Sequence, residues 1–212
     1  MPGRRLFVGV PLPEDAASVI REVVDDVRAM PLPDGARDVR WVRLDGLHLT
    51  LRFLGPTAES LVGPTMAAVD TIASGAIGPM SIELAGTGTF PSGRRPRTLW
   101  IGISQGIDGL SELAAATESA LVAAGWQSDG RPFRPHLTLA RSDGIAAGRM
   151  VADRLAAVLA DRRISCSIDH VGLFESLTGG GPARYVPVTL RPLGPSPRPA
   201  GPVYHLDAPD PS

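Results

Sequence analysis

The tetrapeptide His-Leu-Thr-Leu occurs twice, as His48–Leu51 and as His136–Leu139, in a chain of 212 residues that contains four histidines. An imidazole has an ordinary pKa of ~6.5, so near neutral pH one copy can accept a proton while the other donates one. Threonine hydroxyls can donate hydrogen bonds to oxygen atoms that carry negative charge. Two His-Thr pairs facing one cleft would therefore suit acid–base chemistry on a phosphodiester.

Both tetrapeptides have the alternating pattern of a β-strand, in which successive side chains point to opposite faces. The polar face of the first copy carries His48, Thr50 and Arg52, and that of the second carries Arg134, His136 and Thr138. The opposite faces carry Leu47, Leu49, Leu51 and Phe53 in the first copy, and Leu137 and Leu139 in the second. Each strand is therefore predicted to pack its leucines against helices and to present histidine and threonine on the other side.

The elements that must position these strands alternate between strand and helix along the chain. Apolar alternation predicts strands at 5–10, 47–54, 80–90, 98–104, 135–141, 164–176 and 183–193. Helical periodicity predicts helices at about 14–30, 58–75, 107–124 and 147–161.

The order of elements repeats. The segment LFVGV at 6–10 corresponds to LWIGI at 99–103, and each is followed by a helix, an HLTL strand, another helix and another strand. This predicts an α+β fold with two similar lobes from an internal duplication, each an antiparallel-type sheet with helices, whose sheets face each other across a cleft. Residues 1–193 are expected to form one bilobal domain, with duplicated halves at about 5–90 and 98–193, and the Pro-rich tail at 194–212 is expected to be disordered.

Composition and charge indicate the compartment in which the protein works and its relation to membranes. The net charge is −1, and all 21 basic residues are arginine. A single cysteine, Cys166, excludes an internal disulfide framework and fits a reducing compartment. No stretch approaches the roughly 18 apolar residues of a membrane span, and the chain starts without the apolar segment of a signal peptide. We expect a cytoplasmic monomer with no membrane association.

Other candidate residues have ordinary structural interpretations. His170 is expected to be a polar strand residue, His205 an exposed residue of the tail, and Cys166 a small buried filler. The turn Gly179–Gly181 lacks the lysine and the strand-to-helix context of a P-loop. The arginines of the segment 94–97 could contact an RNA backbone or could be a solvated linker. Two histidines without cysteines or clustered carboxylates make a poor metal site, so no metal is expected.

The paired motif resembles the H-x-T-x signature of the 2H phosphoesterase superfamily. The segments RRLFVGVPLPEDA, LHLTLRFLG, FRPHLTLAR and GLFESLTGGGPARYVPV are similar to those of the RNA 2′,3′-cyclic phosphodiesterases, also called 2′-5′ RNA ligases. The resemblance covers about residues 4–193. It implies a bilobal α+β fold, no metal or other cofactor, and opening of a 2′,3′-cyclic phosphate to a 2′-phosphomonoester.

By motif position, the resemblance implies that His48 is the proton donor and His136 the proton acceptor, with Thr50 and Thr138 on the phosphate. Arg141 matches an arginine that follows the second motif in many relatives. Strict alternation points Arg141 away from His136, so a phosphate role for it requires a bulge or a strand end. By alternation Arg134 and Arg52 have the better orientation for binding substrate.

The substrate stays open between several alternatives. The leading interpretation is an RNA end with a 2′,3′-cyclic phosphate. The same chemistry could act on a small cyclic nucleotide or on an ADP-ribose cyclic phosphate. A non-catalytic module that binds RNA ends is the third alternative.

Overall fold

The computed structural model describes residues 3–93, 95–143, 146–179 and 181–194. The helices are α1 (Glu14–Arg28), α2 (Glu59–Ala73), α3 (Ile107–Ala123) and α4 (Gly148–Val158), with a 3₁₀ turn at Leu44–Gly46. The strands are β1 (Arg4–Pro11), β2 (Arg40–Trp41), β3 (His48–Thr57), β4 (Met80–Phe90), β5 (Thr98–Gln105), β6 (His136–Arg141), β7 (Ile164–Ile168), β8 (His170–Leu177) and β9 (Arg184–Pro192). The elements predicted from the sequence are confirmed, with two additions: the short strand β2, and a break at Asp169 that divides the predicted strand 164–176 into β7 and β8.

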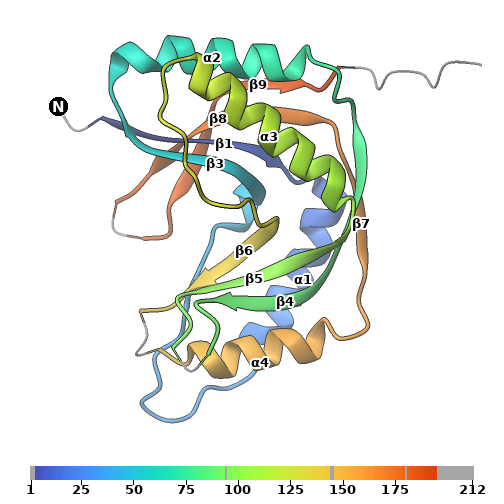
Figure 1. Ribbon diagram of the computed structural model, residues 1–212. Helices are drawn as coiled ribbons and strands as arrows, with labels where there is room; N and C mark the ends of the chain where they lie inside the picture. The colour runs from blue at the N-terminus through green and yellow to red at the C-terminus, as the bar shows by residue number, and fades with distance from the viewer. Residues whose placement is uncertain (1–2, 94, 144–145, 180, 195–212) are drawn as a thin grey trace, which may run out of the picture.

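Two antiparallel sheets form the two lobes of the α+β fold. One sheet has the strand order β3-β1-β8-β9, and the other has the order β2-β6-β5-β4-β7. In Figure 1 the first sheet lies in the upper part of the molecule and the second in the lower part.

The two lobes are not the two halves of the sequence. β1 and β3 pair with β8 and β9 of the second half, whereas β4 of the first half pairs with β5 and with β7. β2 and β4 of the first half thus join the sheet of β5 and β6, and β8 and β9 of the second half join the sheet of β1 and β3. The halves at about 5–90 and 98–193 therefore share both lobes, and the predicted strand 164–176 is broken because β7 and β8 belong to different sheets.

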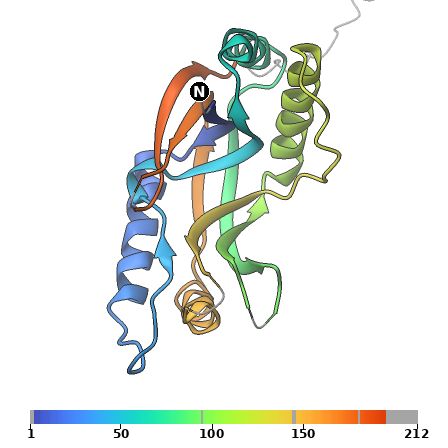
Figure 2. The ribbon, with the colours of Figure 1, turned by 90° about the vertical axis from the view of Figure 1, so that its left-hand side faces the viewer.

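The helices follow the same exchange. α1 contacts α4 and β7, and α3 contacts α2 and β3, so each lobe is covered by one helix from each half. In Figure 2, α1 and α3 flank the sheets on opposite sides, and α2 and α4 lie at opposite ends. The helix α1 shows why such helices pack well: Ile20, Val23, Val24 and Val27 recur at helical spacing and are all buried.

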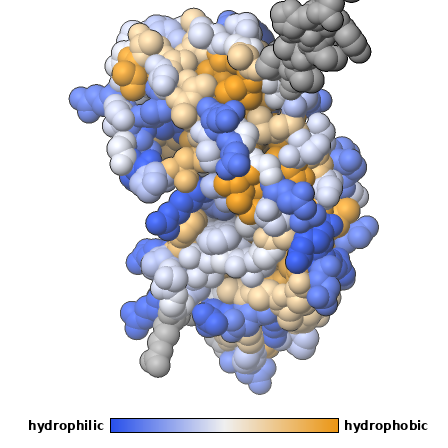
Figure 3. Space-filling model, turned by 45° about the vertical axis from the view of Figure 1, so that its right-hand side comes forward, coloured by the Kyte–Doolittle hydropathy of each residue, from blue (hydrophilic) through white to orange (hydrophobic). Residues whose placement is uncertain are grey.

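One face of the molecule can be judged for continuous apolar area. On the face shown in Figure 3 the apolar residues form small patches separated by hydrophilic ones. Among the described residues, no helix is both long and apolar enough to cross a membrane.

Candidate active site

A β-bulge follows the threonine in both HLTL strands. In β3, Thr50 lies opposite Gly9 of β1 while Arg52 lies opposite Val8, so Leu51 is an extra residue. In β6, Thr138 lies opposite Trp100 of β5 while Ala140 lies opposite Leu99, so Leu139 is the extra residue. A one-residue bulge reverses the alternation of all the residues after it.

The bulge in β6 turns Arg141 towards the histidine face. Arg141 lies opposite Thr98 of β5, as Thr138 lies opposite Trp100, and residues directly opposite each other share a face of the sheet. The Nη1 atom of Arg141 is 3.3 Å from the hydroxyl of Thr98. The bulge that a phosphate role for Arg141 requires is therefore present.

The bulge in β3 contradicts the predicted strand faces of two residues, Arg52 and Phe53. Arg52 lies opposite the buried Val8 and does not share the face of His48. Phe53, expected on the leucine face, lies opposite Phe7, is 45% exposed and lines the same cavity as His48. The guanidinium carbon of Arg5 is 5.4 Å from the centre of the Phe53 ring.

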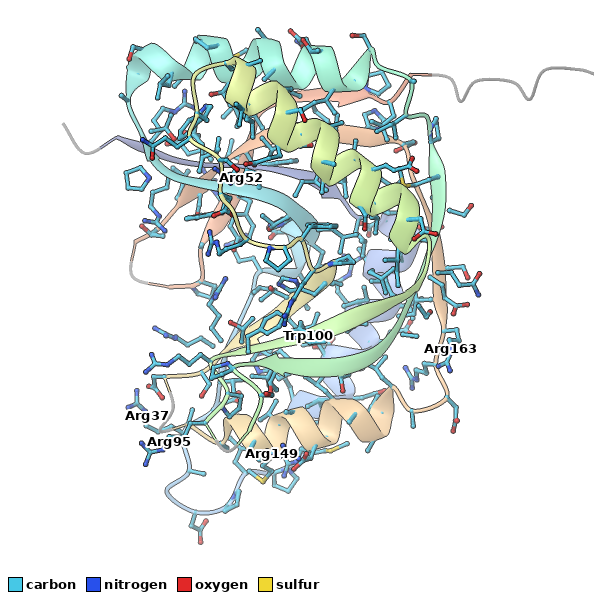
Figure 4. The ribbon with its side chains drawn as sticks, viewed as in Figure 1. Arg37, Arg52, Arg95, Trp100, Arg149 and Arg163 are labelled. Atoms are coloured by element: carbon cyan, nitrogen blue, oxygen red, sulfur yellow. The ribbon has the colours of Figure 1, made fainter. Side chains whose placement is uncertain are left out.

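Arg52 is held by groups from the second half of the chain. Its Nη1 atom is 3.1 Å from Oε2 of Glu118 and 3.3 Å from Oδ2 of Asp129, although neither pair has the alignment of a hydrogen bond. Its Nη2 atom donates a hydrogen bond to the carbonyl of Gln127. Figure 4 shows Arg52 beside β3, below α3. Because two carboxylates already match its charge, we do not assign Arg52 to the phosphate.

His48 is fixed by its own backbone and by two aromatic rings. Its Nδ1 atom is 2.8 Å from the carbonyl of Gly46. A carbonyl only accepts, so Nδ1 carries a proton and Nε2 is the atom available for chemistry. The ring stacks on Phe7 at 4.5 Å and meets the edge of Tyr185 at 4.6 Å. Burial lowers the pKa of His48 to about 4, and the charges of Arg141 and His136 act in the same direction, against the Gly46 carbonyl.

His136 repeats this arrangement in the other lobe. Its Nδ1 atom is 2.7 Å from the carbonyl of Arg134, again two residues upstream. Phe90 meets it edge-on at 5.1 Å, and Trp100 lies at 6.0 Å. Burial is also the main cause that lowers the pKa of His136, the Arg134 carbonyl opposes it, and the charge of Arg141 adds to the lowering.

The two histidines line two adjoining cavities that share Thr50. One cavity, of about 470 Å³, is lined by His48, Thr50, Thr138 and Arg141. The other, of about 730 Å³, is lined by Thr50, His136 and Arg134. Among the described residues, neither threonine hydroxyl has a side-chain hydrogen-bond partner, so both can bind a substrate oxygen. The fold therefore brings all of the predicted site residues to these two cavities, although Arg52 lines the second one with its charge already paired.

The remaining candidates lie away from this centre. His170 begins β8 and its Nδ1 atom is 2.7 Å from a carboxylate oxygen of Asp169. Cys166 is buried in β7, and burial raises the pKa of its thiol to about 11. Within the described part of the chain no three His, Cys, Asp or Glu residues are grouped so that they could hold a metal ion. His205 and Arg94 lie outside the described residues, as do residues 195–212 of the tail.

The aromatic surroundings of the histidines were missed from the sequence. The repeat itself contains a signal for two of them, because LFVGV and LWIGI place Phe7 and Trp100 at corresponding positions. Phe7 lies against His48 and Trp100 lies near His136. Tyr185 lies in the segment GLFESLTGGGPARYVPV but was not predicted as a site residue, and Phe90 comes from a strand that no motif singles out.

Known proteins share this sequence pattern and this fold. An RNA 2′,3′-cyclic phosphodiesterase of Geobacillus stearothermophilus is 34% identical over 135 residues, which are 64% of this chain but 41% of that protein. The protein of the same name from Bacillus subtilis is 33% identical over 135 residues, which are 64% of this chain and 69% of that protein.

The structural likeness extends over nearly the whole fold. The crystal structure of E. coli LigT complexed with 3′-AMP superposes with a TM-score of 0.65 at 25% identity, covering 91% of this chain and 99% of that one. Residues 12–180 match the family model described as the 2′-5′ RNA ligase superfamily. With its two HLTL strands placed at one cleft, this chain belongs to the 2′-5′ RNA ligase superfamily, a family of 2H phosphoesterases.

Proposed function

We propose that this protein hydrolyses 2′,3′-cyclic phosphate ends of RNA to 2′-phosphomonoesters by acid–base catalysis with two histidines and without a metal. The observation that supports this most strongly is the matched orientation of the two imidazoles. Each donates its Nδ1 proton to a carbonyl two residues upstream, and each leaves Nε2 free beside a threonine of the same strand. Such an arrangement suits an acid and a base that act on one phosphate.

In the proposed reaction the neutral His136 accepts a proton from water, whose oxygen forms the new bond to phosphorus. The bond between phosphorus and the 3′ oxygen breaks, and protonated His48 gives its proton to that oxygen. Thr50 and Thr138 donate hydrogen bonds to the non-bridging oxygens, and Arg141 supplies positive charge. The products are a 2′-phosphomonoester and a free 3′ hydroxyl, so one water is consumed.

The relatives support this choice of substrate. The relatives from Geobacillus stearothermophilus and Bacillus subtilis are named RNA 2′,3′-cyclic phosphodiesterases, and the E. coli LigT structure contains 3′-AMP, a nucleotide with a phosphate on its ribose. The cavity beside His48 also carries Phe53 and Tyr185, whose rings can pack against a nucleoside. All the proposed catalytic groups come from one chain, which supports action as a monomer. The cytoplasmic location stays a prediction.

Product analysis tests the proposal. An oligoribonucleotide with a 2′,3′-cyclic phosphate end is incubated with the protein in excess EDTA, and the product is compared by chromatography with synthetic 2′- and 3′-phosphate standards. We expect complete conversion to the 2′-phosphate at an unchanged rate in EDTA. A 3′-phosphate product would reject the assigned bond cleavage, and loss of activity in EDTA with rescue by Mn²⁺ or Zn²⁺ would reject the metal-free mechanism.

A further inference from the structure

Around the cleft lie arginines that, among the described residues, have no carboxylate partner. Arg5 and Arg141 line the cavity beside His48, and Arg134 lines the one beside His136. Several arginines elsewhere are paired with carboxylates: Arg149 with Asp153, Arg163 with Glu83, and Arg191 with Asp70. Others, such as Arg154, donate only to backbone carbonyls. Although the net charge of the chain is −1, positive charge is therefore left unbalanced at the cleft.

Arg40 extends this unbalanced charge along the edge of one sheet. β2 pairs with β6 so that Arg40 lies directly opposite Arg141 and Trp41 lies opposite Ala140. Ala140 is buried and Trp41 packs against the core, so the two arginines are on the other face, with Thr138. Arg40 is exposed, and in the described parts of the chain it has no ion-pair or side-chain hydrogen-bond partner.

Two like charges directly opposite each other in a ladder repel, because their Cα atoms are roughly 5 Å apart. A bound anion removes this cost. Arg141 is near enough to both histidines for its charge to lower both of their pKa values, so it belongs to the reacting phosphate. Arg40 is one strand further out, where a second negative charge connected to the first would lie.

We infer that Arg40 binds the phosphodiester that precedes the terminal cyclic phosphate of an RNA chain. This inference rests on the proposed function, and it assigns to Arg40 the discrimination between RNA ends and free cyclic mononucleotides. The reacting phosphate lies with Arg141, and the next phosphate of the chain lies with Arg40. Figure 4 shows Arg37 and Arg95 in the lower left of the view; Arg37 pairs with Asp143, whereas Arg95 has no carboxylate partner among the described residues.

The experiment compares kcat/KM for adenosine 2′,3′-cyclic phosphate with that for a trinucleotide ending in a 2′,3′-cyclic phosphate. Arg40→Gln should lower kcat/KM on the trinucleotide roughly tenfold to hundredfold, the loss of one charge-assisted contact. It should change the value for the mononucleotide less than about twofold, because that substrate lacks the second phosphate. The slope of log kcat/KM against log salt should fall by about one on the trinucleotide.

A substrate modification identifies the phosphate. The test substrate is a trinucleotide whose last internucleotide linkage is an uncharged methylphosphonate. Wild type should hydrolyse this substrate as slowly as Arg40→Gln hydrolyses the normal trinucleotide. Arg40→Gln should hydrolyse the two trinucleotides at the same rate. Arg149→Gln, which removes an exposed arginine of α4 that pairs with Asp153 and lines neither histidine cavity, is the matched control and should match wild type on all three substrates. Arg40→Lys should retain most of the rate on the trinucleotide.

Equal losses on the mononucleotide and the trinucleotide would overturn the inference, as would no loss on either or a methylphosphonate effect that persists in Arg40→Gln. The proposed function fails separately, if wild type hydrolyses neither substrate. In that case, the affinity for a fluorescent oligonucleotide with a 2′-phosphate end still tests Arg40. If the Arg40→Gln variant binds that oligonucleotide as tightly as wild type does, the second phosphate site is rejected.

Discussion

His48 and His136 have matched backbone hydrogen bonds but differ in how strongly the fold opposes their protonation. Burial lowers the pKa of His48 to about 4 and also lowers that of His136. A general acid must hold a proton when the leaving oxygen departs, so the free protein is not in the reactive state at neutral pH. A phosphate anion between the imidazoles favours their charged forms. Substrate binding is therefore expected to raise the pKa of His48, so that this imidazole takes up the proton it needs as the acid.

The labels of acid and base can be separated with a substrate whose leaving group needs no proton. A pH profile does not separate them, because the same bell-shaped curve arises with either assignment. On a 2′,3′-cyclic phosphate His48→Ala and His136→Ala should each lose about 10²–10⁴-fold in rate. On an activated phosphodiester with a phenolate leaving group, His48→Ala should recover most of its loss and His136→Ala should stay slow. Recovery by His136→Ala instead would show that the labels are reversed.

The lowered pKa of His48 also predicts how stability depends on pH. Between about pH 4 and 6.5 the unfolded chain binds a proton that the folded chain does not, so stability is full above pH 6.5 and falls as the pH drops through this window. The loss attributable to His48 reaches about 3 kcal/mol near pH 4. Urea unfolding at pH 7 and pH 4.5 measures it, and His48→Gln should show a smaller difference between the two values than wild type.

The control variant is His170→Gln, which removes a partly exposed histidine whose Nδ1 atom lies 2.7 Å from a carboxylate oxygen of Asp169. It should retain the pH dependence of wild type. If His48→Gln also loses as much stability as wild type between pH 7 and pH 4.5, the buried neutral imidazole is not the source of the effect.

At the residue scale, the sequence predicted correctly which face of a strand a side chain occupies as long as successive side chains alternate, and it failed after a bulge interrupts this alternation. His48 and Thr50 precede the bulge in β3, and His136 and Thr138 precede that in β6, so their faces followed from period-two reasoning. Arg52 and Phe53 come after the bulge, and their predicted sides were wrong. A bulge adds a residue without any marked change in composition, so neither LTLRF nor LTLAR signals it.

At the scale of single elements, the rings beside the histidines are positioned by the strands that pair with β1 and β5. Phe7 of β1 lies opposite Phe174 of β8, and these rings stack at 5.3 Å. At the corresponding place in the other sheet, Trp100 of β5 lies opposite Gly88 of β4. A Cβ atom at Gly88 would lie 2.1 Å from the indole ring, so the larger ring near His136 requires a residue without a side chain.

Gly88→Ala should therefore displace Trp100 and disturb the packing of His136. We expect a loss of about 1–3 kcal/mol in the free energy of unfolding, the range for overpacked sites, together with a fall in kcat. Gly63→Ala is the control, because a Cβ at that position of α2 meets nothing within 4 Å. That variant should gain about 0.5–1 kcal/mol from helix propensity. Urea unfolding of both variants checks the pair, and a Gly88→Ala protein as stable as wild type would contradict the close approach.

At the scale of the whole molecule, the repeated order of elements could be recognised in the sequence, but the exchange of strands between sheets could not. The recurring order of elements predicted two similar lobes, and the two sheets confirm this. The order of elements along a chain does not determine which sheet a later strand joins, and β4 and β8 each cross to the other half's sheet. This exchange ties the lobes together, because β7 belongs to one sheet and β8, which follows it after Asp169, belongs to the other.

Arg52 adds a second connection between the halves. It links β3 to Glu118 of α3 and to Asp129 in the loop before β6, with only 10% of its side chain exposed. Arg52→Met leaves Glu118 without its cation and Asp129 with Arg131 alone, and should cost about 1–3 kcal/mol in the free energy of unfolding. Arg191→Met removes an exposed pair with Asp70 and should change it by less than about 0.5 kcal/mol. Equal effects in denaturant unfolding would mean that Arg52 is an ordinary surface arginine.

The paired-histidine site is tested most directly by single-turnover hydrolysis of a 2′,3′-cyclic-phosphate oligonucleotide by wild type, His48→Ala, His136→Ala and the double variant. Each single variant, with wild-type circular dichroism, should be at least about 100-fold slower than wild type. The double variant should lose much less than the product of the two single losses, because the two imidazoles act in one step. A single variant within about tenfold of wild type would show that its histidine is neither the acid nor the base, and would contradict the account.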